Sequence, residues 1–488
     1  MFSSLDRRPW LAGLLLALAG MGAVFFSMPH GAGLSPDSIS YIAGGRSLAR
    51  DHSLAGINSH WPPFYPFLLA LAAGPHGSLF ASAKLLCAAA AGLNVFVFHR
   101  LMLTCGWRAL FALPLSACVA LDPDFVNLHL MAWSEPIFLG LVLAAMLALQ
   151  FHLQHGRMRA LYAAALLFGL AALTRYAGLA FIAAAGLMLL WRGVRAKDDA
   201  ARIEALLSAL KFGVPAVLPL AFYVLMHGGS GGNGVRSFQF HPLAGNDWVL
   251  LLAQAVDWLG GPWIFVMVMC AVFVVAVRCR GALPPAARRL SCMALVFGAV
   301  YLAFVIVSIT FFDAYIPLDG RILSPLKLMC YLSLFAFFSS VPDKFKVLPV
   351  VLAAAFMLCV TYPETRALAA QSSQEGFGFA QPAFARLPIL TYLRDNHVAL
   401  DACNSPELAL LYLDSEVPML PAMFDPTSKL PFPAYPREME KLAHSGSTVA
   451  IFAPLMWRAY LPMAGQLRQA GFTEILYLRS DGTVLRHP

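Results

Sequence analysis

Long runs of apolar residues separated by short polar segments fill roughly the first 360 positions of the chain. Runs of about 17–25 apolar residues have the length that crosses a bilayer as a helix, the form in which a single segment satisfies its own backbone polar groups in lipid. The pattern predicts a polytopic α-helical membrane protein with about eleven transmembrane helices. They are expected at about 10–28, 79–101, 108–121, 133–153, 160–174, 177–191, 212–227, 262–278, 290–312, 322–340 and 346–361.

One stretch fits this scheme poorly. Residues 160–191 are apolar except for Thr174, Arg175 and Tyr176 in the middle. This stretch is too long for one upright helix and too short for two full spans at about 1.5 Å per residue. Basic clusters at both of its ends favour a short hairpin with Arg175 at the tip. A single tilted helix is the alternative, and it would reverse the sidedness of everything that follows.

Beyond Tyr362 the long apolar runs give way to short strands, helices and turns. Strands are expected at 398–401, 448–453 and 475–479, the last followed by a tight turn at 480–482. Helices are expected at 406–413 and 461–471. The pattern predicts a transmembrane domain over 1–361 and a small α/β domain over 362–488.

Composition supports the membrane assignment. Of the 488 residues 59% are hydrophobic and only 12% are charged, more apolar surface than a soluble core needs. The net charge of +8 is no sign of nucleic-acid binding, because the basic residues lie in short loops between the runs. The nine cysteines show no CxxC or Cys/His spacing, so neither a disulfide framework nor a zinc site is indicated.

Basic residues set the expected orientation, since short cytoplasmic loops are enriched in Lys and Arg. Placing every basic cluster in the cytoplasm leaves the other loops poor in Lys and Arg, with the N-terminus inside and the C-terminal domain outside. The first apolar segment lacks a convincing signal-peptide cleavage site and is interpreted as an uncleaved span. The clusters are Arg7/Arg8, Arg100/Arg108, Arg157/Arg159, Arg192/Arg195/Lys197/Arg202/Lys211, Arg278/Arg280/Arg288/Arg289 and Lys344/Lys346.

The first candidate site residue is Asp37, which follows the first span in Ser35-Pro36-Asp37. Ser is a good N-cap and Pro is favoured at the first helical position, so Asp37 is expected in the first turn of a helix. The helix macrodipole favours its ionised form there. Asp37 either complements the helix start or acts as a general base. Tyr41 lies one turn further along the same face and is a candidate substrate contact.

Three more acidic residues are expected on the same side of the membrane. Asp122 and Asp124 follow the third span, and Glu135 opens the fourth. Carboxylates at membrane depth are rare and usually functional. Asp122-Pro123-Asp124 resembles a DxD metal motif, but Asp-Pro pairs also begin turns, and Glu135 could merely cap a helix. Glu135 is a catalytic candidate, Asp124 a substrate-binding candidate, and the two aspartates are candidates for a divalent cation such as Mg or Mn.

Arg175 and Arg321 are the cationic candidates, each in an outer loop otherwise poor in Lys and Arg. A guanidinium group at the membrane surface can bind phosphate oxygens through two hydrogen bonds. The alternatives are a salt bridge, for example Arg321 with Asp313 or Asp319, or extension toward lipid headgroups. His60, before Trp61, is a further substrate-binding candidate with a structural alternative. Two lysines, Lys84 and Lys327, lie within expected spans and are expected to be paired or to extend to the surface.

Four motifs in this order resemble membrane glycosyltransferases of the GT-C fold. They are Ser-Pro-Asp37-Ser-x-Ser-Tyr41, Trp61-Pro-Pro-x-Tyr-Pro-x-Leu-Leu-Ala, Ser134-Glu135-Pro, and Leu173-Thr-Arg175-Tyr-Ala-Gly. The resemblance is strongest to bacterial polyprenyl-phosphate sugar transferases related to protein mannosyltransferases and aminoarabinose transferases. It covers the spans to about Pro325.

The resemblance implies a specific assignment of roles. The family's catalytic aspartate, in the first outer loop, falls on Asp37, and its second acidic residue falls on Glu135 or Asp124. Some relatives use a metal at a DxD-like pair and others need none, and the sequence leaves both open. A polyprenyl-phosphate-linked sugar donor, a glycan, lipid or protein acceptor, and a place in the bacterial cytoplasmic membrane are implied. No residues of this sequence can be matched to acceptor-binding residues of the family.

Two other classes of protein remain as alternatives. A transporter or flippase of lipid-linked sugars would also be polytopic with charges in its spans, but it is expected to show internal repeats, and no self-similar halves are found. A non-catalytic subunit that presents the C-terminal domain to a partner would not need Asp37, Arg175 and Arg321 on one side of the membrane.

Overall fold

The computed structural model describes most of the chain in two compact units. One unit comprises Met1–Ala32 and Ser40–Gln374, and the other comprises Gly33–Ile39 and Glu375–Pro488. The described residues are 8–54, 57, 61–74, 77–227, 240, 242–278, 283–313, 316–342, 345–424, 430–455 and 458–488.

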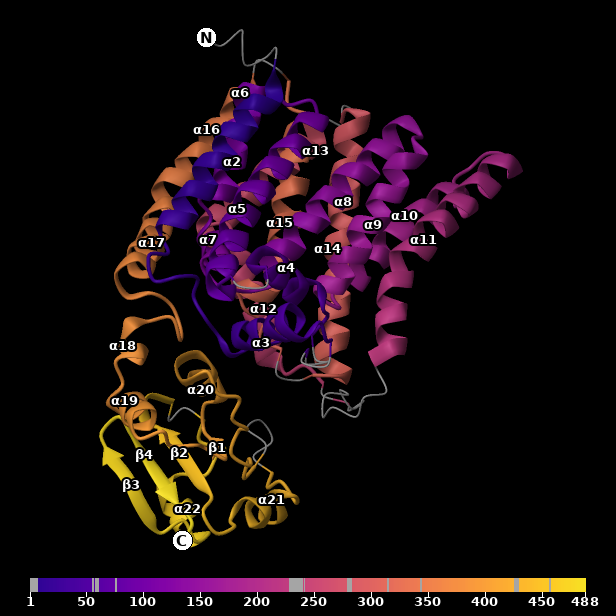
Figure 1. Ribbon diagram of the computed structural model, residues 1–488. Coiled ribbons are helices and arrows are strands. Elements are labelled where there is room, and N and C mark those ends of the chain that lie inside the picture. The colour runs from indigo at the N-terminus through magenta and orange to yellow at the C-terminus, as the bar shows by residue number, and fades with distance from the viewer. Residues whose placement is uncertain are drawn as a thin grey trace. The chain divides into compact units, whose positions relative to one another are not determined.

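The first unit is helical throughout its described part (Figure 1). Its helices are α2 (Pro9–Phe26), α3 (Pro36–Asp51, which begins in the other unit), α4 (Phe64–Ala73), α5 (Leu79–Thr104), α6 (Ala109–Ala120), α7 (Pro123–Leu130), α8 (Glu135–His155), α9 (Met158–Thr174), α10 (Gly178–Val194), α11 (Asp199–His227), α12 (Gly245–Asp257), α13 (Pro262–Arg278), α14 (Pro285–Phe311), α15 (Gly320–Phe338), α16 (Val347–Phe356), the π-helix η2 (Met357–Thr361) and α17 (Tyr362–Glu375).

Every one of the eleven expected spans falls on a helix, but fewer of them qualify as full membrane spans. Among the described residues seven helices are long and apolar enough to cross a membrane. The number rises to eight if the bent pair α6–α7 is counted as one span. The reason is length: α9, α10 and α13 have 17 residues each. A helix of that length is about 26 Å long, slightly less than the roughly 30 Å hydrocarbon core. The protein is a multi-pass membrane protein.

The awkward stretch forms two helices, which confirms the predicted hairpin. Residues Arg175–Ala177 join α9 to α10, and the backbone N–H of Gly178 donates to the carbonyl of Arg175 at 2.8 Å to close the turn. A side chain at Gly178 would collide with the backbone of Ala172. The hairpin therefore requires glycine at this position and places Arg175 at its tip.

The core of the first unit lies where α9, α10, α11 and α14 meet. One phenylalanine from each helix is completely buried there. Three pairs of these rings lie edge to face with centroids 5.7–6.1 Å apart, and a fourth pair is stacked at 6.5 Å. Such pairs contribute roughly 0.5–1.5 kcal/mol beyond the burial of their area. The four residues are Phe168, Phe181, Phe212 and Phe297.

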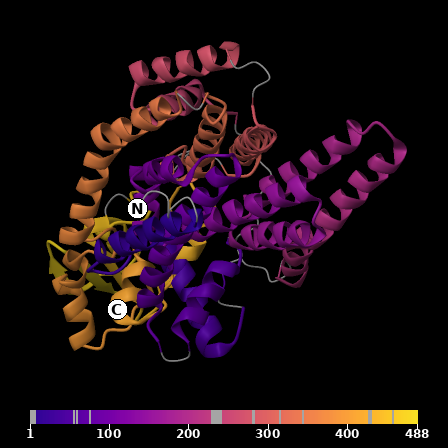
Figure 2. The same ribbon diagram turned by 90° about the horizontal axis from the view of Figure 1, so that it is seen from above.

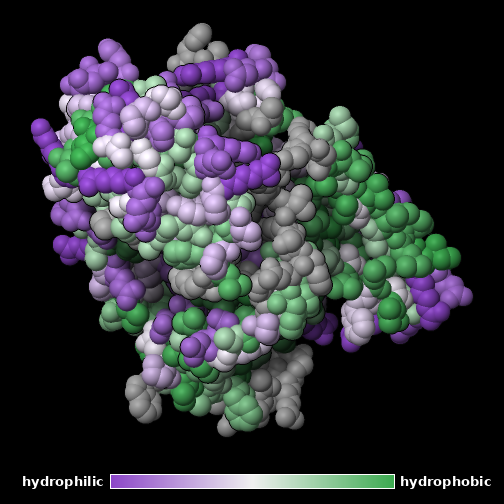
Figure 3. Space-filling view, turned by 90° about the horizontal axis from the view of Figure 1, so that it is seen from below, coloured by the Kyte–Doolittle hydropathy of each residue, from purple (hydrophilic) through white to green (hydrophobic). Residues whose placement is uncertain are grey.

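The outer surface of this unit is apolar, as a surface in contact with lipid requires. Helices α10 and α11 extend away from the other helices as a pair (Figures 1 and 2). They expose large apolar side chains such as Leu187, Trp191 and Leu210. Figure 3 shows their green, hydrophobic surface ending in a hydrophilic tip. The polar tip carries part of the basic cluster between residues 192 and 202.

The last span continues further than expected. It was predicted to end at residue 361, but the helix runs on through α17 to Glu375. Pro363 has no backbone N–H and would normally end or kink a helix. A π-helical segment, Met357–Thr361, precedes it, and the wider turn accommodates the missing hydrogen bond.

The second unit contains a four-stranded sheet of order β1-β2-β4-β3. Within this sheet β1 pairs with β2 in parallel, and the β2–β4 and β3–β4 pairs are antiparallel. The strands are β1 (Ala402–Cys403), β2 (Thr448–Phe452), β3 (Glu474–Arg479) and β4 (Gly482–Arg486), and the helices are α18 (Pro382–Ala385), α19 (Pro388–Asp395), α20 (Pro406–Leu413), α21 (Tyr435–Leu442), the 3-10 helix η3 (Ala453–Leu455) and α22 (Ala464–Gln469).

These elements confirm most of the expected pattern, including the helix at 406–413 and the hairpin at 480–482. The strand expected at 398–401 is wrong, because pairing begins only at Ala402. Asp401 lies directly before β1 and is bound to the start of β2. Its N–H donates to the carbonyl of Thr448, and its carboxylate accepts from the N–H of Thr448, both at 2.8 Å.

A short N-terminal segment belongs to this second unit. Leu34 forms an isolated parallel bridge with Gly378. Its N–H donates to the carbonyl of Phe377 at 3.2 Å, and its carbonyl accepts from the N–H of Phe379 at 2.9 Å. The start of α3 is therefore held by a segment more than three hundred residues away in the sequence.

Candidate functional site

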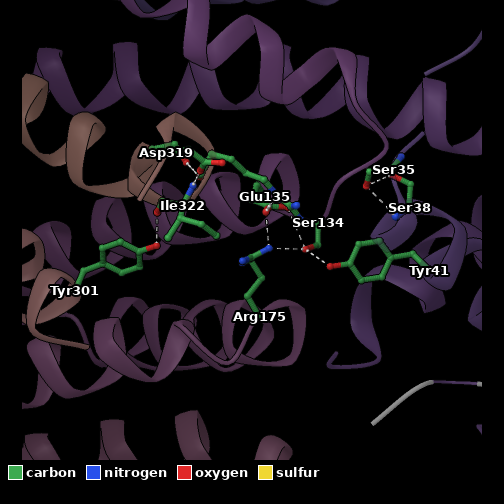
Figure 4. Close-up of polar contacts among 11 residues, drawn as sticks. Ser35, Ser38, Tyr41, Ser134, Glu135, Arg175, Tyr301, Asp319 and Ile322 are labelled. Atoms are coloured by element: carbon green, nitrogen blue, oxygen red, sulfur yellow. Dashed lines mark hydrogen bonds and ion pairs between the residues drawn. The ribbon is translucent and has the colours of Figure 1, made fainter. Parts of the chain in front are cut away.

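Glu135, the first residue of α8, is the centre of a buried ionic cluster in the first unit (Figure 4). Its side chain is 3% exposed. Arg175 approaches Glu135 Oε1 at 2.6 Å, and the Nε of Arg321 donates to the same oxygen. Ser134 donates its hydroxyl to Glu135 Oε2 at 3.4 Å. The structure thus brings together three residues that the sequence had placed in separate outer loops.

Each arginine is presented by the end of a helix. Arg175 sits at the tip of the α9–α10 hairpin. Arg321 lies in the first turn of α15, whose N-cap is Asp319, with the carboxylate accepting from the N–H of Ile322 at 3.0 Å. The hydroxyl of Tyr301 donates to the carbonyl of Ile322 at 2.6 Å and holds this turn from α14. Asp319, one of the salt-bridge partners considered for Arg321, caps α15 through its Oδ1 atom, and Arg321 forms a salt bridge with Glu135.

An aromatic and hydroxyl network extends the cluster toward α3. The hydroxyls of Tyr41 and Ser134 lie 3.1 Å apart, and Arg175 donates to Ser134 at 3.3 Å. Since the proton of Ser134 is directed to Glu135, Tyr41 donates to Ser134. The ring of Tyr41 packs edge-to-face against Tyr65 and Trp61 at 5.1 and 5.7 Å. Tyr41 is 1% exposed, so its expected position beside the site is fixed by packing.

The arginines of the cluster present hydrogen-bond donors that suit an anion. Both guanidinium groups share the Glu135 carboxylate. The side chains of Arg175 and Arg321 are 20% and 18% exposed, so part of each group remains accessible. Each guanidinium carries five N–H donors in a fixed planar arrangement. Trp133 covers the Arg321 guanidinium at 4.3 Å from the ring centroid and fixes its plane. Such a cluster is suited to a phosphate group.

Asp37 lies where the sequence predicts, in the first turn of α3. Ser35 accepts a hydrogen bond from the N–H of Ser38 at 3.3 Å, and Ser38 accepts one from the N–H of Ser35 at 3.1 Å. This reciprocal pair confirms the expected helix start and positions Asp37 next to the positive end of the helix. Asp37 and Tyr41 are four residues apart, on the same face of α3.

Asp122 and Asp124 are bound by a lysine. Lys327 Nζ lies 2.7 Å from Asp122 Oδ2 and 2.8 Å from Asp124 Oδ2. Asp122 Oδ2 also accepts from the hydroxyl of Tyr331 at 2.9 Å, and its Oδ1 caps α7 by accepting from the N–H of Phe125 at 3.0 Å. Asp122 therefore begins a helix, where the Asp-Pro pair had suggested a turn as the alternative to a metal motif. Among the described residues no group of three or more His, Cys, Asp or Glu side chains could hold a metal ion.

Sequence reasoning gave too little weight to three residues of these clusters. Ser134 was considered only as part of the motif around Glu135, but its side chain makes no capping hydrogen bond and joins Tyr41, Arg175 and Glu135. Lys327 was expected to be paired, without a named partner, and Tyr331 was not considered. The signal that could have identified Lys327 and Tyr331 is a lysine inside an expected span, one turn before a tyrosine. His60 lies outside the described residues.

Several solved structures have a fold similar to that of this chain. A crystal structure of ArnT from Cupriavidus metallidurans bound to undecaprenyl phosphate matches with a TM-score of 0.58 at 14% identity, over 97% of this chain and 98% of that chain. The apo structure of the same protein matches with a TM-score of 0.59 at 13% identity, over 97% of each chain. The arabinofuranosyltransferase AftD from Mycobacteria matches at 0.53 and 14% identity, over 99% of this chain and 40% of that chain.

No protein-family model matches the chain, and no curated protein matches it in sequence. The structural likeness extends over nearly the whole chain. At this level of identity the likeness establishes the fold. The chain has the GT-C fold that its motifs predicted.

Proposed function

We propose that this chain is an integral-membrane glycosyltransferase that moves a sugar from a polyprenyl-phosphate donor to an acceptor hydroxyl. The observation that carries this proposal is the Glu135 cluster, in which two partly exposed guanidinium groups share one buried carboxylate. The fold supports it, because ArnT was crystallised with undecaprenyl phosphate and has the same fold.

Arg175 and Arg321 would bind the phosphate of the donor. Phosphate is already a good leaving group, so its departure needs charge stabilisation more than protonation. Guanidinium groups fixed in position before the reaction supply that stabilisation with little reorganisation. The planar arginine side chains can each donate two hydrogen bonds to phosphate oxygens.

Asp37 would be the general base. In a single displacement the acceptor oxygen attacks the anomeric carbon, and its proton passes to the Asp37 carboxylate. The bond between that carbon and the phosphate oxygen breaks, and polyprenyl phosphate leaves with the electron pair. One such displacement inverts the anomeric centre. The start of α3 suits this role, because a general base must be held in position at the acceptor, and Asp37 lies in the first turn of that helix, on the same face as Tyr41.

Glu135 would position the arginines. It was a catalytic candidate, but its Oε1 atom is engaged by both guanidinium groups and its Oε2 atom by Ser134. A carboxylate so occupied is poorly placed to take a proton from an acceptor. Tyr41 would hold Ser134 in turn, through the hydrogen bond between their hydroxyls.

The site would face the outside of the bacterial cytoplasmic membrane. The Glu135 cluster lies at the start of α8 and at the end of α9, whereas Arg157 and Arg159 lie between the other ends of these two helices. A basic loop marks the cytoplasmic side. This orientation leaves the N-terminus inside and the C-terminal unit outside, with the acceptor approaching from the extracytoplasmic space.

The test is turnover by the purified protein in detergent with a panel of undecaprenyl-phosphate-linked sugars, followed by mass spectrometry. The wild type is expected to release undecaprenyl phosphate from at least one donor, and Asp37→Asn is expected to release it at least about 100-fold more slowly, the order of a general base's contribution. Asp51→Asn, at the exposed end of the same helix, is the matched control and is expected to be as active as the wild type. Equal activity of Asp37→Asn would refute the role of Asp37.

An assay of the same protein in proteoliposomes distinguishes a transferase from a transporter. A transferase consumes the donor and leaves polyprenyl phosphate. A flippase would move intact donor to the opposite leaflet without consuming it. Movement of donor without cleavage would therefore contradict the proposed reaction.

A further inference from the structure

The two aspartates of the DxD-like motif and a lysine from a distant helix form a second ionic cluster in the first unit. Lys327 on α15 lies within 2.8 Å of both Asp122 and Asp124, which flank the start of α7. The lysine and Asp122 side chains are 8% and 3% exposed, and Asp124 is 33% exposed. Three charges are thus gathered at one point, at the DxD-like motif whose two aspartates the sequence suggests as candidates for a divalent cation.

We propose that Lys327 is a built-in cation that takes the place of a divalent metal ion between Asp122 and Asp124. The proposal concerns this cluster alone and goes beyond the transfer reaction. It predicts that the wild type binds no divalent ion at these carboxylates, and that removing the ammonium group creates a site for one.

The first argument is the occupancy of the carboxylate oxygens. Asp122 Oδ2 accepts from Lys327 and from Tyr331, Asp122 Oδ1 accepts from the backbone of Phe125, and Asp124 Oδ2 accepts from Lys327. A cation would have to displace these donors, and it would then lie beside an ammonium group of the same sign. Mg²⁺ needs six oxygen ligands at about 2.0–2.1 Å, and carboxylates that already accept from Lys327 cannot contribute to such a set.

The second argument is space. The cavity that these side chains line has a volume of about 20 Å³. That is enough for roughly one water molecule. A divalent ion such as Mg²⁺ normally keeps several waters of its shell, and while the ammonium group lies between the carboxylates a cavity of this volume cannot hold them. Lys327 fills the position between the carboxylates without bringing any water.

The third argument is the backbone around the cluster. Helices α6 and α7 are bent by 60° where Asp122 caps the second helix. The carboxylate of Asp124 lies against Gly320, where a Cβ atom would overlap it. Gly320 begins α15, directly before Arg321. Lys327 therefore ties the broken span α6–α7 to the helix that carries Arg321, as a bound metal ion would.

The test is binding of Mn²⁺, followed by the electron paramagnetic resonance signal of the free ion, together with the melting temperature in the presence of Mn²⁺ or EDTA. The wild type is expected to leave the Mn²⁺ signal unchanged at micromolar concentrations and to melt at the same temperature in both media. Lys327→Met keeps the length of the side chain and removes its charge. It is expected to bind Mn²⁺ and to gain a few degrees of melting temperature when Mn²⁺ is present.

Two control variants test whether the Mn²⁺ response of Lys327→Met comes from Asp122 and Asp124. The double variant Lys327→Met with Asp124→Asn is expected to lose the Mn²⁺ response, because one of the two carboxylates is gone. Lys84→Met removes a lysine that lies 4.1 Å from the ring of Phe25, and it is expected to show no Mn²⁺ response. If Lys327→Met does not fold in the absence of metal, its melting temperature cannot be measured. The yield of folded protein after purification with and without Mn²⁺ is then compared instead.

Two results would overturn the proposal. One is tight binding of Mn²⁺ by the wild type that Asp124→Asn abolishes. The other is a Lys327→Met variant that neither binds Mn²⁺ nor depends on it for folding. None of these readouts uses the transfer reaction, so they remain valid if the chain proves to have another activity.

Discussion

At the scale of single residues, the site depends on contacts that join distant parts of the sequence. Glu135 and Arg321 are 186 positions apart, and Lys327 and Asp124 are 203 apart. The capping of α3 by Ser35, in contrast, involves neighbours in the chain. Local rules therefore predicted the place of Asp37 correctly. For a salt bridge of Arg321 they offered only its sequence neighbours Asp313 and Asp319 and did not point to Glu135, because spacing along the chain says nothing about which helix ends meet.

Glu135 gives the sharpest prediction at this scale. Glu135→Gln is expected to destabilise the protein by about 3–5 kcal/mol, because two partly buried guanidinium groups lose their common carboxylate. It is also expected to raise KM for the donor. Melting in detergent and steady-state kinetics are the measurements. Glu135→Asp retains the charge and is expected to recover part of both losses.

The control is Glu204→Gln, at an exposed position of α11, which is expected to change stability by less than about 0.5 kcal/mol. If Glu135→Gln melts like the wild type and keeps its KM, the buried cluster does not hold the arginines in place.

At the scale of elements, helix packing depends on small residues at specific contacts. Gly169 of α9 lies so close to α11 that a Cβ atom would be 2.9 Å from the carbonyl oxygen of Ala216. The apolar pattern predicted both helices, but it could not tell which of their many small residues mark a contact. The pattern also missed the continuation through α17, because a π-helical segment before Pro363 follows no apolar period.

The element-scale prediction compares two glycines in neighbouring helices. Gly169→Ala is expected to lower the melting temperature by several degrees, because the backbone of α11 must move away. Gly186 of α10 has no atom within 4 Å of its added Cβ, so Gly186→Ala is expected to leave stability unchanged or raise it slightly. Thermal unfolding in one detergent checks both. Equal effects of the two substitutions would contradict the close α9–α11 contact.

At the scale of the whole molecule, orientation in the membrane decides which compartment the site faces. The basic clusters predict it from the sequence, since positive charge in short loops is a direct physical determinant of insertion. The division of the chain is harder to predict. The N-terminal segment Gly33–Ile39 belongs with Glu375–Pro488, and this follows from backbone hydrogen bonds between Leu34 and the segment around Gly378.

Labelling of single exposed positions tests the orientation. In spheroplasts of a bacterial host, a membrane-impermeant maleimide is expected to label Ser445→Cys in the C-terminal unit and to spare Ala200→Cys near the tip of α11. Labelling is compared with that of the parent protein. Cys403 is expected not to interfere, because burial raises the pKa of its thiol to about 12 and leaves little thiolate at neutral pH. The reverse labelling pattern would place the site in the cytoplasm.

The central claim is that the Glu135 cluster binds the lipid phosphate while Asp37 activates the acceptor. The most direct measurement is the dissociation constant of a donor lipid, taken beside the rate of a single turnover, for Asp37→Asn and Arg175→Gln. Asp37→Asn is expected to bind the donor like the wild type and to turn over at least about 100-fold more slowly. Arg175→Gln is expected to weaken binding by about 10–100-fold, the loss of one or two charge-assisted hydrogen bonds. Unchanged binding by Arg175→Gln, or unchanged turnover by Asp37→Asn, would contradict the account.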